Sequence, residues 1–520
     1  MTGLLSDLTT WANLPVAAAD GTELVLDAHV PPATQWPVPV VVTRTPYGRS
    51  THLAEGRSWR SRGFGFVVQD VRGRYDSAGI WTPYRNERAD GAALLDWVLD
   101  QPWCDGRIAV LGGSYAGYTA WTMAAERPVA ALLSLGPSMG LHRTKFEPSG
   151  ILRLAEHAGW WLDRADARTS RDGLRRLVFA EHPDLLAHLP VSGIADLLGA
   201  RLPHWTDTLA MHPSDTPAEA VTDAEVRGLA APSLHVGGWY DLLVYEVLDL
   251  HARSGSAVSP RPRRDLVVGP WGHDLGMDGT TTVGAREHGV TARLPLGTLF
   301  VEWLRAALDD PTAPGNARVF VPGADRWETT PTWPAPIPTR TWRPGADGTL
   351  DDAAAPHGGV TFAHDPADPF PSTLPAADRA PLLARRDAAR FATGPLRAPL
   401  RVDGAGHADL EVSTTAEGAD WVVRLLEHRP DGRLLEVTRG TAVTAGGGPH
   451  RIRVPLGACA SVVDTGSRLV LEVTGSDFPF LARNLGTGED RHHGTRLRAG
   501  AQTVHTGTSV LALPIGDHRG

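Results

Sequence analysis

A chain of 520 residues, with 42% hydrophobic and 21% charged residues, has the composition of a folded globular protein and is long enough for two or three domains. Its formal net charge of −9 argues against binding to nucleic acid, because phosphates demand clustered basic residues. The two cysteines, Cys104 and Cys459, imply neither a disulfide framework nor a cysteine-based zinc site.

The first 143 residues alternate between strand-like and helix-like segments. Residues 86–100 place apolar side chains on one helical face, and a second helix-like segment follows residue 114. Apolar runs of strand length occur before, between and after these helices, at 37–43, 65–69, 108–111 and 131–135. Strands that alternate with helices predict a parallel sheet, and therefore the α/β fold class.

Beyond residue 143 the pattern changes. Residues 144–231 hold helix-like segments broken by prolines and predict a helical cap inserted in the sheet domain. The sheet pattern returns over 232–335, so the sheet domain is expected to comprise 1–143 and 232–335. Residues 336–520 contain short β-like runs between Gly, Pro and Asp turns and predict an all-β sandwich or jelly roll. Examples of these runs are 421–426, 434–438, 451–454 and 468–473.

The segment IAVLGGSYAGYTAW, residues 108–121, carries the main chemical motif. A buried strand runs into Gly112-Gly113-Ser114 and out into a helix, the arrangement that places a nucleophilic serine on a sharp turn. Ala116 stands where the G-x-S-x-G pattern has its last glycine, but alanine is small enough for the turn. The helix N-terminus favours negative charge, and the Tyr115 amide can donate to an oxyanion. Ser114 is therefore predicted to be a nucleophile, and a glycine-rich turn without chemistry is the alternative.

Two polar residues follow later strands of the predicted sheet. Asp241 ends the run PSLHVGGWYD, and His273 ends the run DLVVGPWGH, each just past a strand-like stretch. Open α/β sheets build their sites at the carboxyl ends of the strands, so both residues are expected beside Ser114. The chain order Ser, Asp, His is that of α/β-hydrolases. We therefore predict a triad in which His273 removes the Ser114 proton and Asp241 orients the imidazole.

Six longer motifs accompany these residues in the chain. They are VVTRTPYGR (41–49), VVQDVRGRYDSAG (67–79), TPYRNERADG (82–91), QPWCDGRIAVLGGSYAGYTAW (101–121), GGWYD (237–241) and GPWGH (269–273). Together they resemble the cocaine-esterase-like hydrolases (CocE/NonD, peptidase S15), relatives of X-prolyl dipeptidyl-peptidases and α-amino acid ester hydrolases. The resemblance covers most of 16–143 and 232–335, and SDFPFLARNLGTGED (476–490) is similar to the C-terminal jelly roll of the family.

The resemblance implies three domains: an α/β-hydrolase core, a helical cap and a C-terminal jelly roll of the galactose-binding-like type. It also implies that Tyr47, in RTPYGR, donates its phenol to an oxyanion hole shared with the Tyr115 amide. A rigid phenol near a strand end can aim one proton at a developing oxyanion. The aromatic-ended cap motif that the family has after His-Pro-Ser is absent, since HPSDTPAEAV (212–221) stands there. The cap-dependent specificity of the family is therefore not carried over.

Four tryptophans are candidates for the substrate pocket. Trp239 and Trp271 stand close to the predicted triad residues in the sequence, whereas Trp160 and Trp161 belong to the cap, where tryptophans are as often plain core. No metal site is predicted, because the sequence has neither an H-E-x-x-H motif nor paired cysteine spacing. The predicted acyl transfer needs no cofactor.

The sequence thus predicts a serine hydrolase that cleaves an ester, as a cocaine-esterase-like carboxylesterase. An X-prolyl dipeptidyl-peptidase or an α-amino acid ester hydrolase or acylase stays open, although the cap acids Glu147, Glu156 and Asp163 form no evident ammonium site. A non-catalytic binding protein with a vestigial hydrolase core is a third alternative. The expected partner is a small-molecule ester or short peptide, without nucleic acid or membrane, and a homodimer stays open. A cytoplasmic location is expected, since no signal-peptide pattern or membrane-length apolar run occurs.

Overall fold

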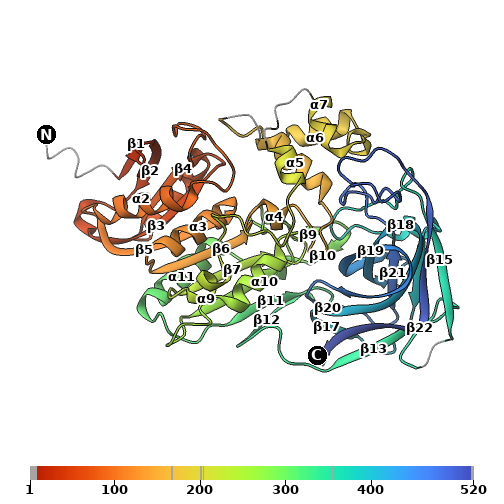
Figure 1. Ribbon diagram of the computed structural model, residues 1–520. Helices are drawn as coiled ribbons and strands as arrows, with labels where there is room; N and C mark the ends of the chain where they lie inside the picture. Colours follow the sequence, from red (N-terminus) through yellow and green to blue (C-terminus); the bar gives the residue numbers. More distant parts are fainter. Residues whose placement is uncertain (1–8, 165–167, 199–201, 203, 354–355, 517–520) are drawn as a thin grey trace.

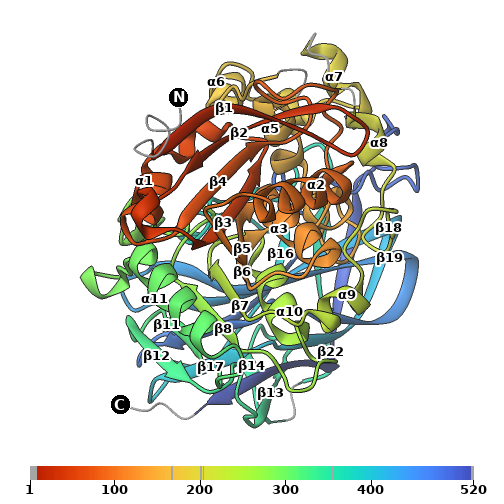
Figure 2. The same cartoon turned by 90° about the vertical axis from the view of Figure 1, so that its left-hand side faces the viewer.

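The computed structural model describes residues 9–164, 168–198, 202, 204–353 and 356–516. Its first part is built on a ten-stranded sheet with the order β1-β2-β4-β3-β5-β6-β7-β8-β11-β12, which Figure 2 shows from top to bottom. The strands are β1 (Thr10–Ala17), β2 (Glu23–His29), β3 (Val38–Thr45), β4 (Gly65–Asp70), β5 (Cys104–Ser114), β6 (Ala131–Pro137), β7 (Ser233–Gly238), β8 (Arg264–Gly269), β11 (Ala317–Val321) and β12 (Arg326–Thr330). From β4 to β11 the strands run parallel, and β1, β2 and β12 form antiparallel edges.

Helices cover both faces of this sheet. One face packs against α2 (Glu87–Leu99), α3 (Tyr115–Glu126) and α10 (Val244–Arg253) in a single hydrophobic cluster. The other face packs against α1 (Leu53–Ser61) and α11 (Leu296–Asp309). Strands that are buried on both faces need apolar residues on both, which explains the nearly continuous apolar runs of the sequence. The α/β-hydrolase expectation is confirmed.

The segment between β6 and β7 is helical. It contains α4 (Leu141–Thr144), α5 (Leu154–Arg164), α6 (Leu174–Glu181), α7 (Ile194–Leu197), α8 (Trp205–Leu209) and α9 (Asp223–Gly228). The side chains of Trp161, Trp205 and Leu152 lie in its hydrophobic core, which Phe478 and Ala482 of the C-terminal part also join. Figure 1 shows α5, α6 and α7 above, between the sheet domain and the C-terminal strands. The cap therefore packs on the C-terminal part. No helix in the described part of the chain is long and apolar enough to cross a membrane.

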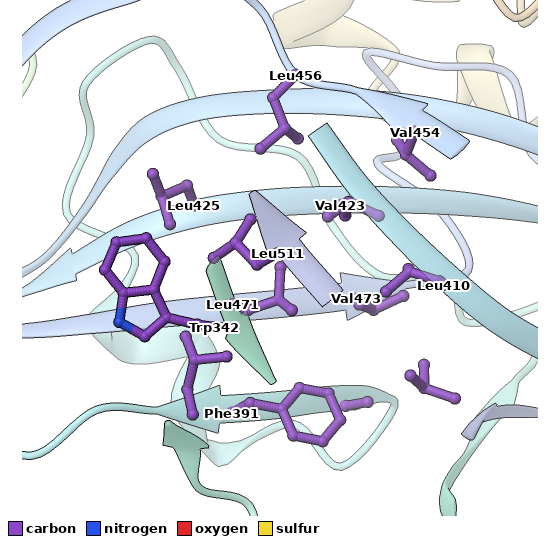
Figure 3. Packing of buried hydrophobic residues seen from close by; sticks show 14 of the residues in the cluster. Trp342, Phe391, Leu410, Val423, Leu425, Val454, Leu456, Leu471, Val473 and Leu511 are labelled. Carbon is purple, nitrogen blue, oxygen red and sulfur yellow. The ribbon is translucent and has the colours of Figure 1, made fainter. Parts of the chain in front are cut away.

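The C-terminal part is an antiparallel β-sandwich. Its larger sheet has the order β14-β13-β22-β18-β21-β16, and β15, β17, β19 and β20 pair alongside. The strands are β13 (Thr339–Pro344), β14 (Leu350–Asp351), β15 (Gly358–His364), β16 (Ala388–Ala392), β17 (Leu400–Gly404), β18 (His407–His428), β19 (Leu434–Pro455), β20 (Cys459–Val463), β21 (Arg468–Thr474) and β22 (Gly500–Gly516). Figure 3 shows Trp342, Phe391 and Leu471 packed between the strands of this core.

The lengths of two sandwich strands differ from the sequence prediction. Residues 434–438 and 451–454 were predicted as separate strands, but they belong to the single 22-residue strand β19, and 421–426 is part of the 22-residue strand β18. The Gly446-Gly447-Gly448 segment has the composition of a turn, and Gly447 and Gly448 are exposed. It nevertheless continues the pairing of β19 with β18, with an irregular register at this point.

Candidate active site

Ser114 lies at the junction of β5 and α3. Its backbone has φ 55° and ψ −124°, a strained conformation for a residue with a side chain. The close approach of strand and helix requires glycine at two positions: a Cβ on Gly112 would lie 1.8 Å from the Ala116 carbonyl oxygen, and one on Gly117 would lie 2.7 Å from Pro137. This geometry is a nucleophile elbow, which holds the serine hydroxyl out of the sheet edge.

Asp241 and His273 meet at the same edge of the sheet. Asp241 follows the end of β7 and His273 follows the end of β8, and both carboxylate oxygens of Asp241 lie 3.0 Å from His273 Nδ1. The Leu243 backbone N–H donates to Asp241 Oδ1 over 3.0 Å, which fixes the carboxylate further. Since the Nδ1 proton is held by the carboxylate, the lone pair of the neutral ring lies on Nε2.

The electrostatics of His273 suit a base. Burial lowers the pKa of the imidazole, but the Asp241 charge and its hydrogen bond raise it, and the net pKa lies above the ordinary value. The carboxylate is buried, whereas 45% of the His273 side chain is exposed. A carboxylate that stabilises the imidazolium in this way is what proton transfer from a hydroxyl requires.

Gly136, at the end of β6, makes room for this pair. Its φ is +44°, and a Cβ there would lie 2.9 Å from Asp241 Oδ2 and 3.8 Å from His273 Nδ1. Gly136 was not among the residues predicted for the site. The signal was a glycine at the carboxyl end of a predicted strand, directly before a proline.

Tyr47 places its phenol beside the serine. Its hydroxyl oxygen lies 3.3 Å from Ser114 Oγ. The Tyr75 hydroxyl donates to the Tyr47 carbonyl oxygen over 2.7 Å, and the Arg164 guanidinium lies 4.9 Å from the Tyr47 ring centre. These contacts hold the ring in place. Among the described residues, the hydroxyl of Ser114 contacts Tyr47 and forms no hydrogen bond with His273.

The Tyr115 side chain points away from the cavity into a buried polar network. Its hydroxyl donates to Glu87 Oε1 over 2.7 Å and accepts a hydrogen bond from the Tyr84 backbone N–H. The Arg44 guanidinium lies 2.7 Å from the other Glu87 oxygen. Burial raises the pKa of Glu87, while Arg44 and Tyr115 stabilise its carboxylate. This network anchors the first turn of α3, whose Tyr115 amide follows the serine. Sequence reasoning missed Glu87, although the NERADG motif contains it.

Ser114, Tyr47 and His273 line one large cavity of about 1350 Å³. The cap contributes Lys145, Glu156 and Arg164 to its wall, and the C-terminal sandwich contributes residues near 372–379, 436–441 and 455–461. Parts of all three predicted domains therefore shape the space around the serine.

The four candidate tryptophans fall into two groups. Trp160 and Trp239 line the cavity. Trp161 and Trp271 lie in hydrophobic cores instead, with 1% and 3% of their surfaces exposed, so the expectation that they wall the pocket needs correction. Adjacent residues of a helix such as α5 point in different directions, so Trp160 and Trp161 cannot share one face.

The acids of the cap that line the cavity all face arginines. Glu147 lies 2.8 Å from Arg153. Arg175 lies 3.6 Å from Glu156 and 3.3 Å from Asp163. The carboxylates on this wall are therefore already neutralised by arginine side chains.

Comparison with known proteins identifies the group. Residues 20–274 match the family model of the X-Pro dipeptidyl-peptidase (S15 family), and residues 311–510 match that of the X-Pro dipeptidyl-peptidase C-terminal non-catalytic domain. A cocaine esterase from Rhodococcus sp. is 31% identical, over 97% of this chain and 98% of its own. This chain belongs to the cocaine esterase-like (CocE/NonD, S15) family of hydrolases. It is therefore a serine hydrolase, as the sequence predicted.

Solved structures agree on the fold. An α-amino acid ester hydrolase superimposes with a TM-score of 0.82 at 20% identity and covers 98% of this chain and 97% of its own. An aminopeptidase from a marine sediment archaeon, Thaumarchaeota archaeon, gives a TM-score of 0.80 at 23% identity, over 99% of this chain and 97% of its own. Proteins that bear different names thus share this fold, so the substrate has to be argued from the side chains of the cavity.

Proposed function

We propose that this family member hydrolyses carboxylic esters through an acyl-enzyme formed on Ser114. The observation that carries the proposal is the convergence of three groups in one cavity. Ser114 stands on the elbow, the Tyr47 hydroxyl oxygen is 3.3 Å from its hydroxyl oxygen, and His273 is held by Asp241. Nucleophile, oxyanion donor and oriented base are the parts that acyl transfer needs.

In the first half of the reaction, His273 Nε2 accepts the Ser114 proton while Oγ attacks the carbonyl carbon of the ester. The serine hydroxyl has to turn from Tyr47 towards His273, and rotation about its single Cα–Cβ bond allows this. The leaving alcohol takes the proton from His273. Water then attacks the acyl-enzyme, with His273 again as base, and releases the acid and the serine.

The charge that develops on the carbonyl oxygen is stabilised by two donors in this proposal. One is the Tyr115 amide at the start of α3, and the other is the Tyr47 phenol. When the serine turns away, the phenol proton is released for the oxyanion. Both donors are held in place before substrate arrives, Tyr115 by Glu87 and Tyr47 by Tyr75.

The pairing of the cap acids favours esters over peptides with a free N-terminus. A dipeptidyl-peptidase must bind a substrate ammonium, which needs carboxylates that face the substrate. Here Glu147, Glu156 and Asp163 lie within 4 Å of arginine nitrogens, so an ammonium would compete with a resident guanidinium. The 31% identity with a cocaine esterase supports the same choice.

The test compares p-nitrophenyl esters with Gly-Pro-p-nitroanilide, using the wild type and Ser114→Ala. We expect ester hydrolysis by the wild type and a loss of about 10³-fold or more in Ser114→Ala. Faster release from the anilide than from any ester would overturn the ester preference. Equal rates for both proteins would remove Ser114 from the mechanism. Labelling by a fluorophosphonate checks the nucleophile without depending on the substrate.

A further inference from the structure

The cavity wall contains one amine, and it is the single lysine of the chain. Lys145 directly follows α4, and only 5% of its surface is exposed. It lines the cavity together with Ser114 and His273. Its charge reaches the active site, because the Lys145 ammonium is one of the groups that lower the pKa of His273.

The backbone around Lys145 is fixed by several contacts. Its N–H donates to the Leu141 carbonyl oxygen over 3.0 Å, and its carbonyl oxygen accepts from the Arg153 N–H over 2.8 Å. The Arg153 guanidinium also donates to the neighbouring Thr144 carbonyl oxygen over 2.9 Å. The ammonium is therefore presented to the cavity from a rigid turn, as a binding group should be.

The ammonium is poorly satisfied by the protein. It carries three N–H donors, yet among the described residues it donates one long hydrogen bond, 3.3 Å to the Glu156 carbonyl oxygen. It also lies 4.9 Å from the ring centre of Trp160. No carboxylate of the described residues lies within 4 Å of it.

The carboxylates of this wall are engaged elsewhere. Glu147 pairs with Arg153, and Glu156 and Asp163 pair with Arg175. Glu156 lies close enough to raise the pKa of Lys145, but Arg153 and Arg175 oppose it, and burial dominates and lowers that pKa to about 7. A buried cation without a counter-ion is costly, and an anion arriving through the cavity would lower that cost.

We propose that Lys145 binds a carboxylate carried by the ester substrate, so that the preferred substrates are esters with one free acid group. This inference rests on the proposed ester hydrolysis, because it places a second recognition point beside that reaction. The carboxylate would accept one or two charge-assisted hydrogen bonds from Nζ, close to the indole of Trp160.

The experiment uses two matched pairs of substrates. p-Nitrophenyl hemiadipate and p-nitrophenyl hexanoate share a six-carbon acyl chain and differ in a terminal carboxylate. 4-Carboxyphenyl hexanoate and 4-carbamoylphenyl hexanoate place the same contrast on the alcohol side. kcat/KM is measured for the wild type, for Lys145→Met, which removes the charge and leaves an unbranched side chain of similar size, and for Lys145→Arg, which keeps the charge.

In one of the two pairs, we expect Lys145→Met to lower kcat/KM for the carboxylate member by about 10- to 100-fold. The neutral member should change less than threefold, and Lys145→Arg should retain much of the preference. The pair that responds tells whether the acid group belongs to the acyl or the alcohol part. The inference is overturned if, in both pairs, Lys145→Met changes kcat/KM by the same factor for the carboxylate member and for the neutral member.

A second readout does not depend on turnover. Because the chain has one lysine, an amine-acetylating reagent labels Lys145 in a single identifiable peptide, and Lys145→Met gives the blank. Monomethyl adipate should slow the labelling of Ser114→Ala protein, whereas methyl hexanoate should not. If the wild type hydrolyses no ester, the proposed function fails. Slower acetylation of Lys145 in the presence of monomethyl adipate then still tests whether Lys145 binds an anion. Equal labelling with both compounds contradicts an anion site.

Discussion

The hydroxyl oxygen of Tyr47 lies 3.3 Å from the hydroxyl oxygen of Ser114, although 67 positions separate the two residues in the chain. The contact exists because β3 and β5 are parallel neighbours, so the segments that follow them leave the sheet at the same edge. In the proposed mechanism this phenol is a donor that acts in the transition state.

Tyr47→Phe should therefore lower kcat for p-nitrophenyl esters by about 10²- to 10³-fold while KM changes little, because one oxyanion donor is lost. Tyr118→Phe is the matched control. Tyr118 lies on α3, and its hydroxyl donates to the Glu219 carbonyl oxygen, so its loss should affect stability rather than kcat. If Tyr47→Phe keeps kcat within threefold of the wild type, the phenol is not part of the oxyanion hole.

Asp241→Asn should change both the rate and its pH dependence. kcat/KM should fall by about 10⁴-fold, because the amide can no longer stabilise the imidazolium and can favour the wrong tautomer. In the wild type, the rate rises as His273 loses its proton, with an acid limb above the ordinary histidine pKa, since the Asp241 charge raises that pKa. Removing the charge should move this limb to lower pH. A limb that stays in place in the pH profile of the variant would assign it to another group.

Gly136→Ala tests the space behind the proposed triad. A Cβ at this position would lie 2.9 Å from Asp241 Oδ2, so the carboxylate must shift, and small displacements of catalytic groups can cost up to about 10²-fold in rate. Gly106→Ala is the control, because Gly106 also has a positive φ, of +89°, but has nothing within 4 Å of the added carbon. Both variants should lose some stability through backbone strain. Only Gly136→Ala should have a lower kcat than the wild type. Similar kcat values for the two variants would contradict the close contact between a side chain at position 136 and Asp241.

The parallel sheet and the polar residues that follow its strands could be predicted from the sequence, because both depend on local patterns. Buried parallel strands need apolar runs, and Asp241 and His273 stand just beyond two of them. Side-chain direction was beyond this reasoning. Trp160 and Trp161 are neighbours on α5, yet Trp160 lines the cavity and Trp161 lies in the cap core.

Residues that act through distant contacts were also hidden. Glu87 contacts Tyr115 and Arg44, which come from other elements of the fold. Among the described residues, Lys145 lacks a carboxylate partner because the nearby acids form ion pairs with Arg153 and Arg175. Such pairings follow from the assembled fold and leave no periodic signal in the chain.

The burial of Lys145 predicts a stability effect that depends on pH. Burial lowers the pKa of this amine from 10.5 to about 7 in the folded protein. Between these pH values the unfolded chain binds a proton that the folded protein does not, so the free energy of unfolding rises with pH. The cost of burying the protonated amine is absent above about pH 10.5 and is complete once the pH has fallen to about 7. Lys145→Met should therefore stabilise the protein more at about pH 6 than at about pH 9, by a difference on the order of 1–3 kcal/mol. Unfolding by urea at the two pH values measures this difference.

Lys145→Arg is the control, because a guanidinium stays charged at both pH values. The difference in unfolding free energy between the Met and Arg variants should therefore not shrink as the pH rises. A gain for Lys145→Met that is the same at both pH values would mean that burial does not lower the pKa of this amine.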